Sequence, residues 1–233
     1  MNNTAHIKLE NDTFAKTVIM PGDPLRSKMI AETLLTDAVL INNVRGIQGY
    51  TGYYNGKKVS VMASGMGNPT MGIYSYELFK FFDVENIIRV GSIGAMQKDI
   101  PIKSLILTEK TFTNTNYNNF YIHNGENYIS GSEELLQLAK AKAEELGINY
   151  RVGNTLCSET FYTDEDEITK AQKNNLLGVE MESAALYLNA QRLGKKALTI
   201  CTVSNNLISG EETTSDERQN AFIDMIKLAL EIA

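Results

Sequence analysis

Short apolar runs and longer amphipathic stretches follow one another along the whole chain. The apolar runs are rich in Val, Ile, Leu and Thr and predict strands over residues 17–20, 59–63, 86–90, 104–108, 151–156 and 198–203. The amphipathic stretches predict helices over residues 25–35, 70–82, 132–146 and 214–232. Because strands and helices alternate, the pattern favours an α/β fold.

The connections between these elements are mostly short. Residues 50–58 are typical of a β-hairpin, with Asn55-Gly56 as its tight turn. Residues 111–129 are rich in Asn and Tyr, show no clear periodicity and stay unassigned. No Pro-rich or Gly/Ser-rich linker interrupts the alternation, so we expect a single domain over residues 1–233.

Composition narrows the class of protein. A formal net charge of −6 argues against a nucleic-acid or membrane-surface binder. Residues 1–10 have no apolar signal core, and no run reaches the roughly 18 apolar residues that span a bilayer, so we expect a cytoplasmic protein. Cys157 and Cys201 lie among strand-like residues and are expected to be buried free thiols. His6 and His123 are the only histidines, so we expect no metal centre.

Glycines and charged residues gather after the predicted strands, where open α/β sheets place their ligands. Gly22 lies in a turn that opens the helix over 25–35, and a helix start presents free N–H groups to an anion. Arg26 would add a bidentate donor. The alternative is a capped helix start with a surface arginine.

Arg89 lies inside an apolar strand, where an unpaired charge is costly. The Gly91-Ser92-Ile93-Gly94 segment that follows is expected to be a turn with a hydroxyl and open amides. With Arg26, and with Arg45 as a third cation or a solvated strand-start residue, these groups predict a cradle for phosphate. The spacings of a P-loop, a dinucleotide fingerprint and a nucleophile elbow are absent.

Glu180 and Glu182 stand two residues apart, just before a helical pattern. If this segment is extended, both carboxylates face one pocket and suit a vicinal diol, with Met181 packed under a sugar. The alternative is an acidic first turn of the following helix. Ser204 and Asn205 follow the last strand and could donate to a base, although an Asn-rich turn also explains them.

Several segments of the chain resemble those of a known family, the bacterial hexameric purine nucleoside phosphorylases of the nucleoside phosphorylase superfamily. The likeness runs nearly end to end. Five segments carry it in the family's order: Met20-Pro-Gly-Asp-Pro-Leu-Arg26, Asn42-Asn-Val-Arg-Gly46, Ile87-Ile-Arg-Val-Gly-Ser92, Gly178-Val-Glu-Met-Glu182 and Ala197-Leu-Thr-Ile-Cys-Thr-Val-Ser204. The resemblance implies one α/β domain with a mixed central sheet flanked by helices on both faces.

The resemblance also implies roles for individual residues. Phosphate binding would fall to Gly22, Arg26, Arg45, Arg89 and Ser92. Ribose binding would fall to His6, Glu180, Met181 and Glu182. The base would meet Phe161, Val179, Ser204 and Asn205, with Asn205 and Arg218 as the catalytic pair at N7. His6 and Arg45 would complete the site of a neighbouring subunit in a homohexamer, a trimer of dimers.

The implied activity is reversible phosphorolysis of purine nucleosides, with inorganic phosphate as co-substrate and no cofactor. Broad-range members of the family have an aspartate where this chain has Asn205, and a histidine is common where it has Asn206. An amide donates a hydrogen bond but transfers no proton. We therefore expect guanosine and inosine to be favoured over adenosine.

The sequence also leaves three other functions open. A nucleoside hydrolase of the same superfamily would need water but no phosphate cradle. A uridine phosphorylase would share the cradle but hold its base differently. A nucleoside-binding protein without turnover is the third, and Asn205 is the one argument for it.

Overall fold

The computed structural model describes residues 3–113, 116–121, 127–164, 166–214 and 222–233. The strands in these residues are β1 (Thr17–Pro21), β2 (Thr36–Asn42), β3 (Gly49–Tyr54), β4 (Lys57–Met62), β5 (Asn86–Ala95), β6 (Leu105–Phe112), β7 (Tyr128–Ser130), β8 (Tyr150–Cys157), β9 (Gly178–Glu180) and β10 (Lys196–Asn206). The helices are α1 (Pro24–Leu34), α2 (Asn68–Phe81), α3 (Glu133–Glu145), α4 (Glu167–Lys173), α5 (Ser183–Leu193) and α7 (Ile223–Glu231), with 3₁₀ turns over Val44–Gly46 and Asn116–Phe120.

All ten described strands belong to one sheet in the order β10-β6-β8-β9-β5-β1-β4-β3-β2, with β7 beside β6. Strands β1, β4, β5 and β10 run parallel, whereas β2, β3 and β6 bring antiparallel pairings. The expected mixed central sheet is therefore confirmed. Strand β10 also pairs with β5, which is four places away from it in this order. Strands β10, β6, β8, β9 and β5 are therefore hydrogen-bonded in a closed ring.

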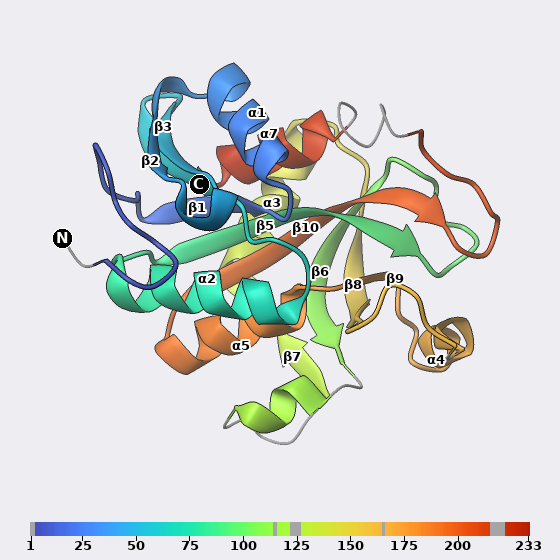
Figure 1. The fold of residues 1–233 in the computed structure, drawn as a ribbon. Coiled ribbons are helices and arrows are strands. Elements are labelled where there is room, and N and C mark those ends of the chain that lie inside the picture. Colours follow the sequence, from blue (N-terminus) through green and yellow to red (C-terminus); the bar gives the residue numbers. More distant parts are fainter. Residues whose placement is uncertain (1–2, 114–115, 122–126, 165, 215–221) are drawn as a thin grey trace.

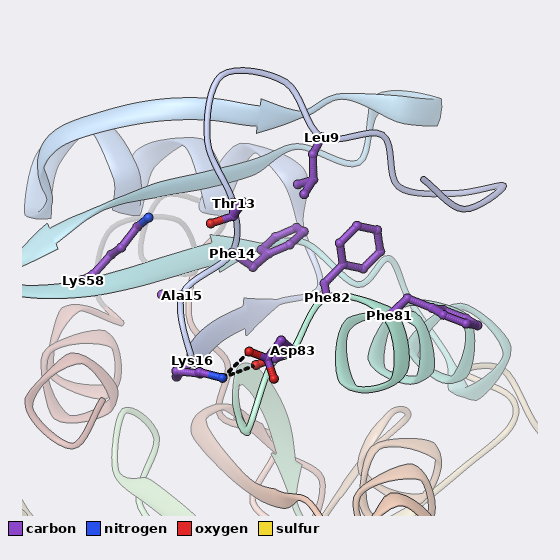
Figure 2. Close-up of a pocket in the computed structure, with 9 residues that line it drawn as sticks. All are labelled: Leu9, Thr13, Phe14, Ala15, Lys16, Lys58, Phe81, Phe82 and Asp83. Carbon is purple, nitrogen blue, oxygen red and sulfur yellow. Dashed lines mark hydrogen bonds and ion pairs between the residues drawn. The ribbon is translucent and has the colours of Figure 1, made fainter. Parts of the chain in front are cut away.

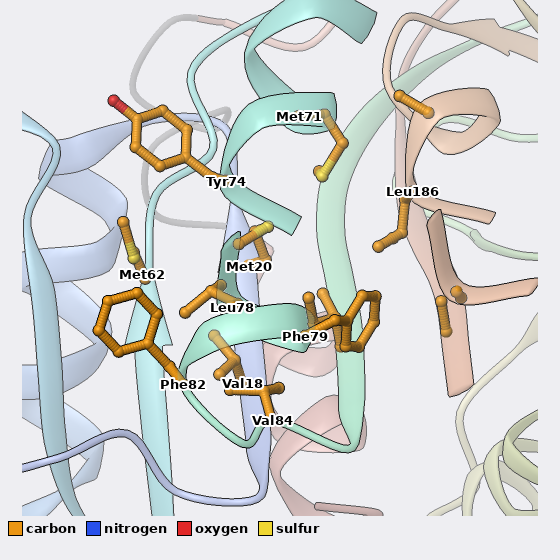
Figure 3. Close-up of a cluster of buried hydrophobic side chains, with 14 of the residues drawn as sticks. Val18, Met20, Met62, Met71, Tyr74, Leu78, Phe79, Phe82, Val84 and Leu186 are labelled. Atoms are coloured by element: carbon orange, nitrogen blue, oxygen red, sulfur yellow. The ribbon is translucent and has the colours of Figure 1, made fainter. Parts of the chain in front are cut away.

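Helices cover both faces of the sheet (Figure 1). On one face α2 and α5 pack on β1 and β5, and their core includes Met71, Leu78 and Leu186 (Figure 3). On the other face α1, α3 and α7 contribute Ile30, Leu136 and Ile226 to a second core. Each helix thus buries an apolar stripe against strands that are apolar on both faces.

The parallel strands place their carboxyl ends along one edge. Met20 of β1 is in register with Arg89 of β5, and Cys201 of β10 is in register with Gly91. The segments that follow β1, β5 and β10 therefore meet at the same edge, as the sequence predicted. That edge is where open α/β sheets bind ligands.

Most predicted elements are confirmed within a few residues. Helix α1 begins after the N-cap Asp23, whose side chain accepts from the Leu25 N–H, and α3 begins after the N-cap Ser132. The hairpin turn is also confirmed, because Asn55 and Gly56 have φ of 48° and 78°, as a type I′ turn requires.

Two predicted strand ends were wrong. Strand β5 continues through Gly91-Ser92-Ile93-Gly94, which was expected to be a turn, because this segment pairs with β10 and then β9. Strand β10 likewise continues through Ser204-Asn205, where its register against β5 shifts by a β-bulge.

The last helix is shorter than predicted in the described residues, since α7 begins at Ile223 and Thr214 is not helical. No described helix has the length and apolar character needed to span a membrane.

Candidate active site

Arg89 and two carboxylates form a buried ionic cluster at the carboxyl edge of the sheet. The Nε of Arg89 donates to Glu180 Oε2 at 3.0 Å, and its Nη2 donates to Glu182 Oε2. All three side chains are almost fully buried. The sequence prediction that Arg89 needs a partner is confirmed, and the partners are the two glutamates that stand two residues apart.

Charge pairing offsets the cost of burying these groups. Burial alone would lower the pKa of Arg89, but Glu182 and Glu180 hold that pKa above its usual value. Burial raises the pKa of Glu182; Arg89 opposes this rise and Glu180 adds to it. The cluster has one cation and two acids, so it can accept a further positive or hydrogen-bonding group.

The two glutamates have different surroundings. Glu180 accepts hydrogen bonds from the backbone N–H groups of Glu182 and Ser183, as well as from the Ser183 hydroxyl. It therefore caps the first turn of α5, which is the helix-start alternative of the sequence analysis. Glu182 is itself the N-cap residue of α5 and its Oε1 accepts from Gly67 N at 2.7 Å.

Gly67 and the adjacent Asn68 were missed as site residues by the sequence analysis. Gly67 has φ of +86°, a conformation that other residues rarely adopt, and this conformation directs its N–H to Glu182. The run Gly65-Met66-Gly67 after a strand was the available signal. Its spacing matches neither a nucleotide-binding motif nor a nucleophile elbow, so the sequence alone gives it no role.

The guanidinium of Arg89 leaves no room for a side chain at position 91, which is occupied by glycine. A Cβ on Gly91 would lie 2.7 Å from Nη1 and Nη2 of Arg89, so the guanidinium lies directly over this residue. Ser92 follows Gly91 on β5 and is exposed.

Arg26 approaches the cluster from α1. Burial lowers its pKa, Asp23 opposes this, and the positive charge of Arg89 lowers the pKa further. Its guanidinium also lies 5.5 Å from the ring centre of Phe222. A dianion bound between these two cations would stabilise the charge of Arg26.

Gly22 lets two loops meet beside Arg26. A Cβ on Gly22 would lie 3.1 Å from the carbonyl oxygen of Gly65, and the Gly65 N–H donates to the Gly22 carbonyl at 3.0 Å. The segments after β1 and β4 are thereby fastened together. The structure thus brings Gly22, Arg26 and Arg89 to one edge.

The β-bulge of β10 presents Asn205 to this edge. Asn205 Oδ1 accepts from the Ser204 hydroxyl at 2.9 Å, and no described residue accepts a hydrogen bond from its Nδ2. Its side chain lies over Gly94, where a Cβ would be 3.5 Å from both Nδ2 and Oδ1. Asn205 therefore retains a donor that a ligand can use.

The remaining base-side and sugar-side candidates lie around this edge. Val179 pairs with Gly94 of β5, and both Val179 and Met181 are half-buried. Phe161 lies on the connection between β8 and α4 with 77% of its surface exposed, and its ring meets that of Tyr162 edge to face. Arg218 lies outside the described residues.

His6 and Arg45 each lie near Tyr74 of α2. The ring centres of His6 and Tyr74 are 6.1 Å apart, and His6 Nδ1 is 2.7 Å from Glu77 Oε1. Burial raises the pKa of Tyr74, while the charge of Arg45 lowers it. His6 also lines a cavity of about 330 Å³ with residues of α2 and α5.

A larger cavity of about 500 Å³ contains none of the predicted site residues. It is lined by Phe14, Phe82 and other residues that precede β1 and β5, with the ion pair of Lys16 and Asp83 beside it (Figure 2). This cavity therefore lies at the amino ends of the parallel strands, opposite the candidate site.

Neither the thiols nor the acids offer a metal site within the described residues. Cys157 and Cys201 are buried and unpaired with each other, as predicted. No group of three or more His, Cys, Asp or Glu residues could hold a metal ion in the described part of the chain.

Comparison with known proteins gives a consistent result. Residues 16–233 match the family model of the phosphorylase superfamily. The chain is 48% identical to the DeoD-type purine nucleoside phosphorylase of Psychromonas ingrahamii over 98% of its length and 97% of that protein. It is 47% identical to the protein of the same name from Caldanaerobacter subterraneus, over 98% and 99% of the two chains.

A crystal structure of uridine phosphorylase from Vibrio fischeri superposes with a TM-score of 0.86 and 27% identity. It covers all of this chain, and 97% of that chain is matched. By its sequence and by its fold, the chain belongs to the phosphorylase superfamily.

Proposed function

We propose that this protein is a purine nucleoside phosphorylase that cleaves purine ribo- and deoxyribonucleosides with inorganic phosphate and favours guanosine and inosine. One observation carries the proposal: Arg26, in the first turn of the helix after β1, and Arg89 of β5 lie at the carboxyl ends of neighbouring parallel strands, and Arg89 is bound to the buried carboxylates of Glu180 and Glu182. The relatives named purine nucleoside phosphorylase match nearly the whole chain and support the same activity.

The reaction needs an anion site, a sugar site and a leaving-group donor. A phosphate oxygen forms a bond to C1′ as the bond from C1′ to N9 breaks, and the base leaves with the electron pair. Arg26, with Gly22, Ser92 and Arg89, would hold the dianion. The negative charge that develops on the purine needs a hydrogen-bond donor at N7.

Glu182 is the better sugar ligand of the two glutamates. Both oxygens of Glu180 are engaged by Arg89, by Ser183 and by the Glu182 N–H. Glu182 has one backbone N–H on Oε1, so this oxygen has a second lone pair for a ribose hydroxyl. In this account Glu180 positions Arg89 and α5, whereas Glu182 and Met181 hold the sugar.

The base side is assigned to Asn205, Ser204, Val179 and Phe161, with Arg218 as the partner of Asn205. The Nδ2 of Asn205 donates to N7, and a 6-oxopurine spreads the developing charge onto O6. Adenine has no such oxygen and presents donors at the equivalent position. A site built around one hydrogen-bonding pattern discriminates strongly against the other.

His6 and Arg45 are assigned to the site of a neighbouring subunit, in a homohexamer built as a trimer of dimers. The place of both residues near Tyr74 of α2 supports this assignment. The protein would act in the cytoplasm and use no cofactor besides its co-substrate, phosphate.

The proposed activity is tested by turnover of inosine, guanosine, adenosine and uridine, each with and without phosphate. Phosphate-dependent release of hypoxanthine and guanine, faster than that of adenine and uracil, is the expected result. Cleavage of purine nucleosides without phosphate would indicate a hydrolase instead. Binding without cleavage would leave only the nucleoside-binding alternative.

The anion site is tested with Arg26→Ala and its matched control Lys28→Ala on the same helix. Arg26→Ala should raise the KM for phosphate at least tenfold, since a charged hydrogen bond contributes about 1.5–3 kcal/mol. Lys28 pairs with the exposed Glu32, so Lys28→Ala should leave this KM unchanged. Arg89→Ala is a poorer test, because it leaves two buried carboxylates without their cation and destabilises the fold.

A further inference from the structure

Asn68, the first residue of α2, lies at the meeting point of three segments. It is fully buried, and its Oδ1 accepts from the Ala185 N–H of α5 at 3.0 Å and from the Cys157 thiol of β8 at 3.4 Å. Its Nδ2 donates to Glu159 Oε1 at 2.6 Å. One buried amide thus joins the start of α2, the start of α5 and the segment after β8.

Each of these segments carries a group of the candidate site. Gly67, next to Asn68, donates its N–H to Glu182. Glu159 stands two residues before Phe161, on a stretch whose residues 159–164 are exposed. The chain before this stretch is fastened separately, because Ser158 N donates to the Glu180 carbonyl at 2.8 Å and the Ser158 hydroxyl donates to Glu167.

From these contacts we propose that Asn68 and Glu159 form a positioning pair that fixes the Phe161 segment against the carboxylate Glu182, and so sets the distance between the base wall and the sugar ligand. This inference rests on the proposed function, in which Phe161 flanks the base. Neither residue of the pair is assigned to touch the substrate.

The physical reason lies in the burial of the Asn68 amide. A buried N–H₂ group must be hydrogen-bonded, and a carboxylate is the stronger acceptor because the bond is charge-assisted. The two helix starts that meet here also favour a negative charge through their dipoles. The hydrogen bond from Asn68 therefore holds Glu159 at the starts of α2 and α5. Because Phe161 is only two residues away, its position is restrained as well.

The pair acts on one side of the substrate only. Its contacts reach the start of α5 and the segment of Phe161, whereas the proposed phosphate ligand Gly22 lies between β1 and α1, and Arg26 lies in the first turn of α1. Loss of the pair should therefore weaken nucleoside binding and spare phosphate binding.

Three substitutions test the pair. Glu159→Ala removes the acceptor, Glu159→Gln keeps an oxygen that can accept from Asn68, and Asp164→Ala removes an acid from the same segment without touching Asn68. Glu159→Ala should raise the KM for inosine about five- to tenfold, with the KM for phosphate unchanged. Glu159→Gln and Asp164→Ala should stay within about twofold of the unsubstituted protein.

Hydrogen–deuterium exchange gives a second readout that needs no turnover. Amides of residues 159–164 should exchange faster in Glu159→Ala than in the unsubstituted protein, and Asp164→Ala should leave their exchange unchanged. Glu159→Ala leaves the buried amide of Asn68 without its acceptor and should lower the melting temperature by a few degrees, whereas Glu159→Gln and Asp164→Ala should leave it close to that of the unsubstituted protein.

The outcomes separate the two proposals. If the unsubstituted protein cleaves no nucleoside, the proposed function fails, and exchange alone decides whether Glu159 holds the segment. If the protein is active but Glu159→Ala changes neither the exchange nor the KM for inosine, the positioning pair is wrong. An equal rise in both KM values would also overturn it, because the effect would then not be confined to the base side.

Discussion

Asn205 and Asn206 are adjacent and chemically identical, but their side chains have different surroundings. Asn206 is buried, its Nδ2 donates to the carbonyls of Gln97 and Ile100, and its Oδ1 accepts from two backbone N–H groups. For Asn205, by contrast, no described residue accepts from its Nδ2. The sequence placed both in one Asn-rich segment, and only the contacts separate the structural amide from the proposed functional one.

The first prediction is that Asn205→Asp raises kcat/KM for adenosine relative to inosine, because a carboxyl can supply the proton that an amide cannot. General acid catalysis contributes about 10²–10⁴-fold, and the gain should be largest below neutral pH, where the carboxyl is more often protonated. Steady-state kinetics between pH 5 and 8 would measure it.

The matched control is Asn206→Asp, which loses two buried donors and should instead lower the free energy of unfolding by about 2 kcal/mol or more. An unchanged ratio of adenosine to inosine turnover in Asn205→Asp would show that Asn205 does not contact N7.

The two thiols give a second prediction at this scale. Burial raises the pKa of Cys201 to about 12 and that of Cys157 well above the ordinary value of 9.0. The native thiols should therefore be almost unreactive toward a disulfide reagent at pH 8, and should react rapidly once the protein is unfolded in guanidinium.

The raised pKa values of the two thiols also determine how the free energy of unfolding changes with pH. As pH rises above about 9, the unfolded chain loses these protons while the folded chain keeps them, so this contribution lowers the free energy of unfolding between about pH 9 and 12. Rapid labelling of the native protein at pH 8 would contradict the burial of both thiols.

At the scale of elements, strand β5 shows what a sequence pattern can and cannot predict. The apolar run predicted its beginning, and the buried charge of Arg89 correctly predicted a partner. The glycines after Arg89 predict a turn, but glycine is also found where a strand packs closely against another group, and the sequence does not distinguish these two cases. Only the position of the guanidinium over Gly91 distinguishes the two.

The sequence pattern also failed to predict some short elements, because their own residues carry too little local signal. Strand β9 is three residues long and pairs with β5 and β8, so tertiary contacts rather than local pattern define it. The bulge in β10 likewise depends on pairing with β5. Long periodic helices such as α3 carry their own signal and were predicted within one residue.

The prediction for β5 compares two glycines of the same strand. Gly91→Ala places a Cβ 2.7 Å from the Arg89 guanidinium and should displace it from Glu180 and Glu182. The loss in the free energy of unfolding should be about 1–3 kcal/mol, and phosphorolysis should fall with it. Thermal unfolding and steady-state kinetics measure the two effects.

Gly94→Ala is the control, because its Cβ would make ordinary contacts at 3.5 Å with Asn205 and Leu207. This variant should keep nearly the full stability. Equal melting temperatures for Gly91→Ala, Gly94→Ala and the unsubstituted protein would mean that Arg89 does not lie over Gly91.

At the scale of the whole molecule, the proposed site is incomplete in one chain. Arg26 and Asn205 are assigned to a subunit's own site, and His6 and Arg45 to the neighbour's. Subunits that carry Arg26→Ala and subunits that carry Arg45→Ala should each be weakly active. After mixing and reassociation, hybrid assemblies should recover part of the activity, because some sites then combine two intact contributions.

The control for this mixing experiment is a pair of substitutions on one site. Mixing Arg26→Ala subunits with Asn205→Ala subunits should recover no activity, since both residues serve the same chain's pocket. Full activity of a monomer, sized by analytical ultracentrifugation at the assay concentration, would contradict shared sites. The single-domain organisation and the homohexamer also remain predictions.

In the proposed reaction, phosphate held at the carboxyl edge of the sheet is the attacking group. The most direct measurement follows inosine cleavage by the purified protein and quantifies hypoxanthine together with ribose 1-phosphate, at increasing phosphate concentrations down to none. We expect one ribose 1-phosphate for each hypoxanthine and no release of hypoxanthine without phosphate. Hypoxanthine released at the same rate in phosphate-free buffer, with free ribose as the product, would contradict it.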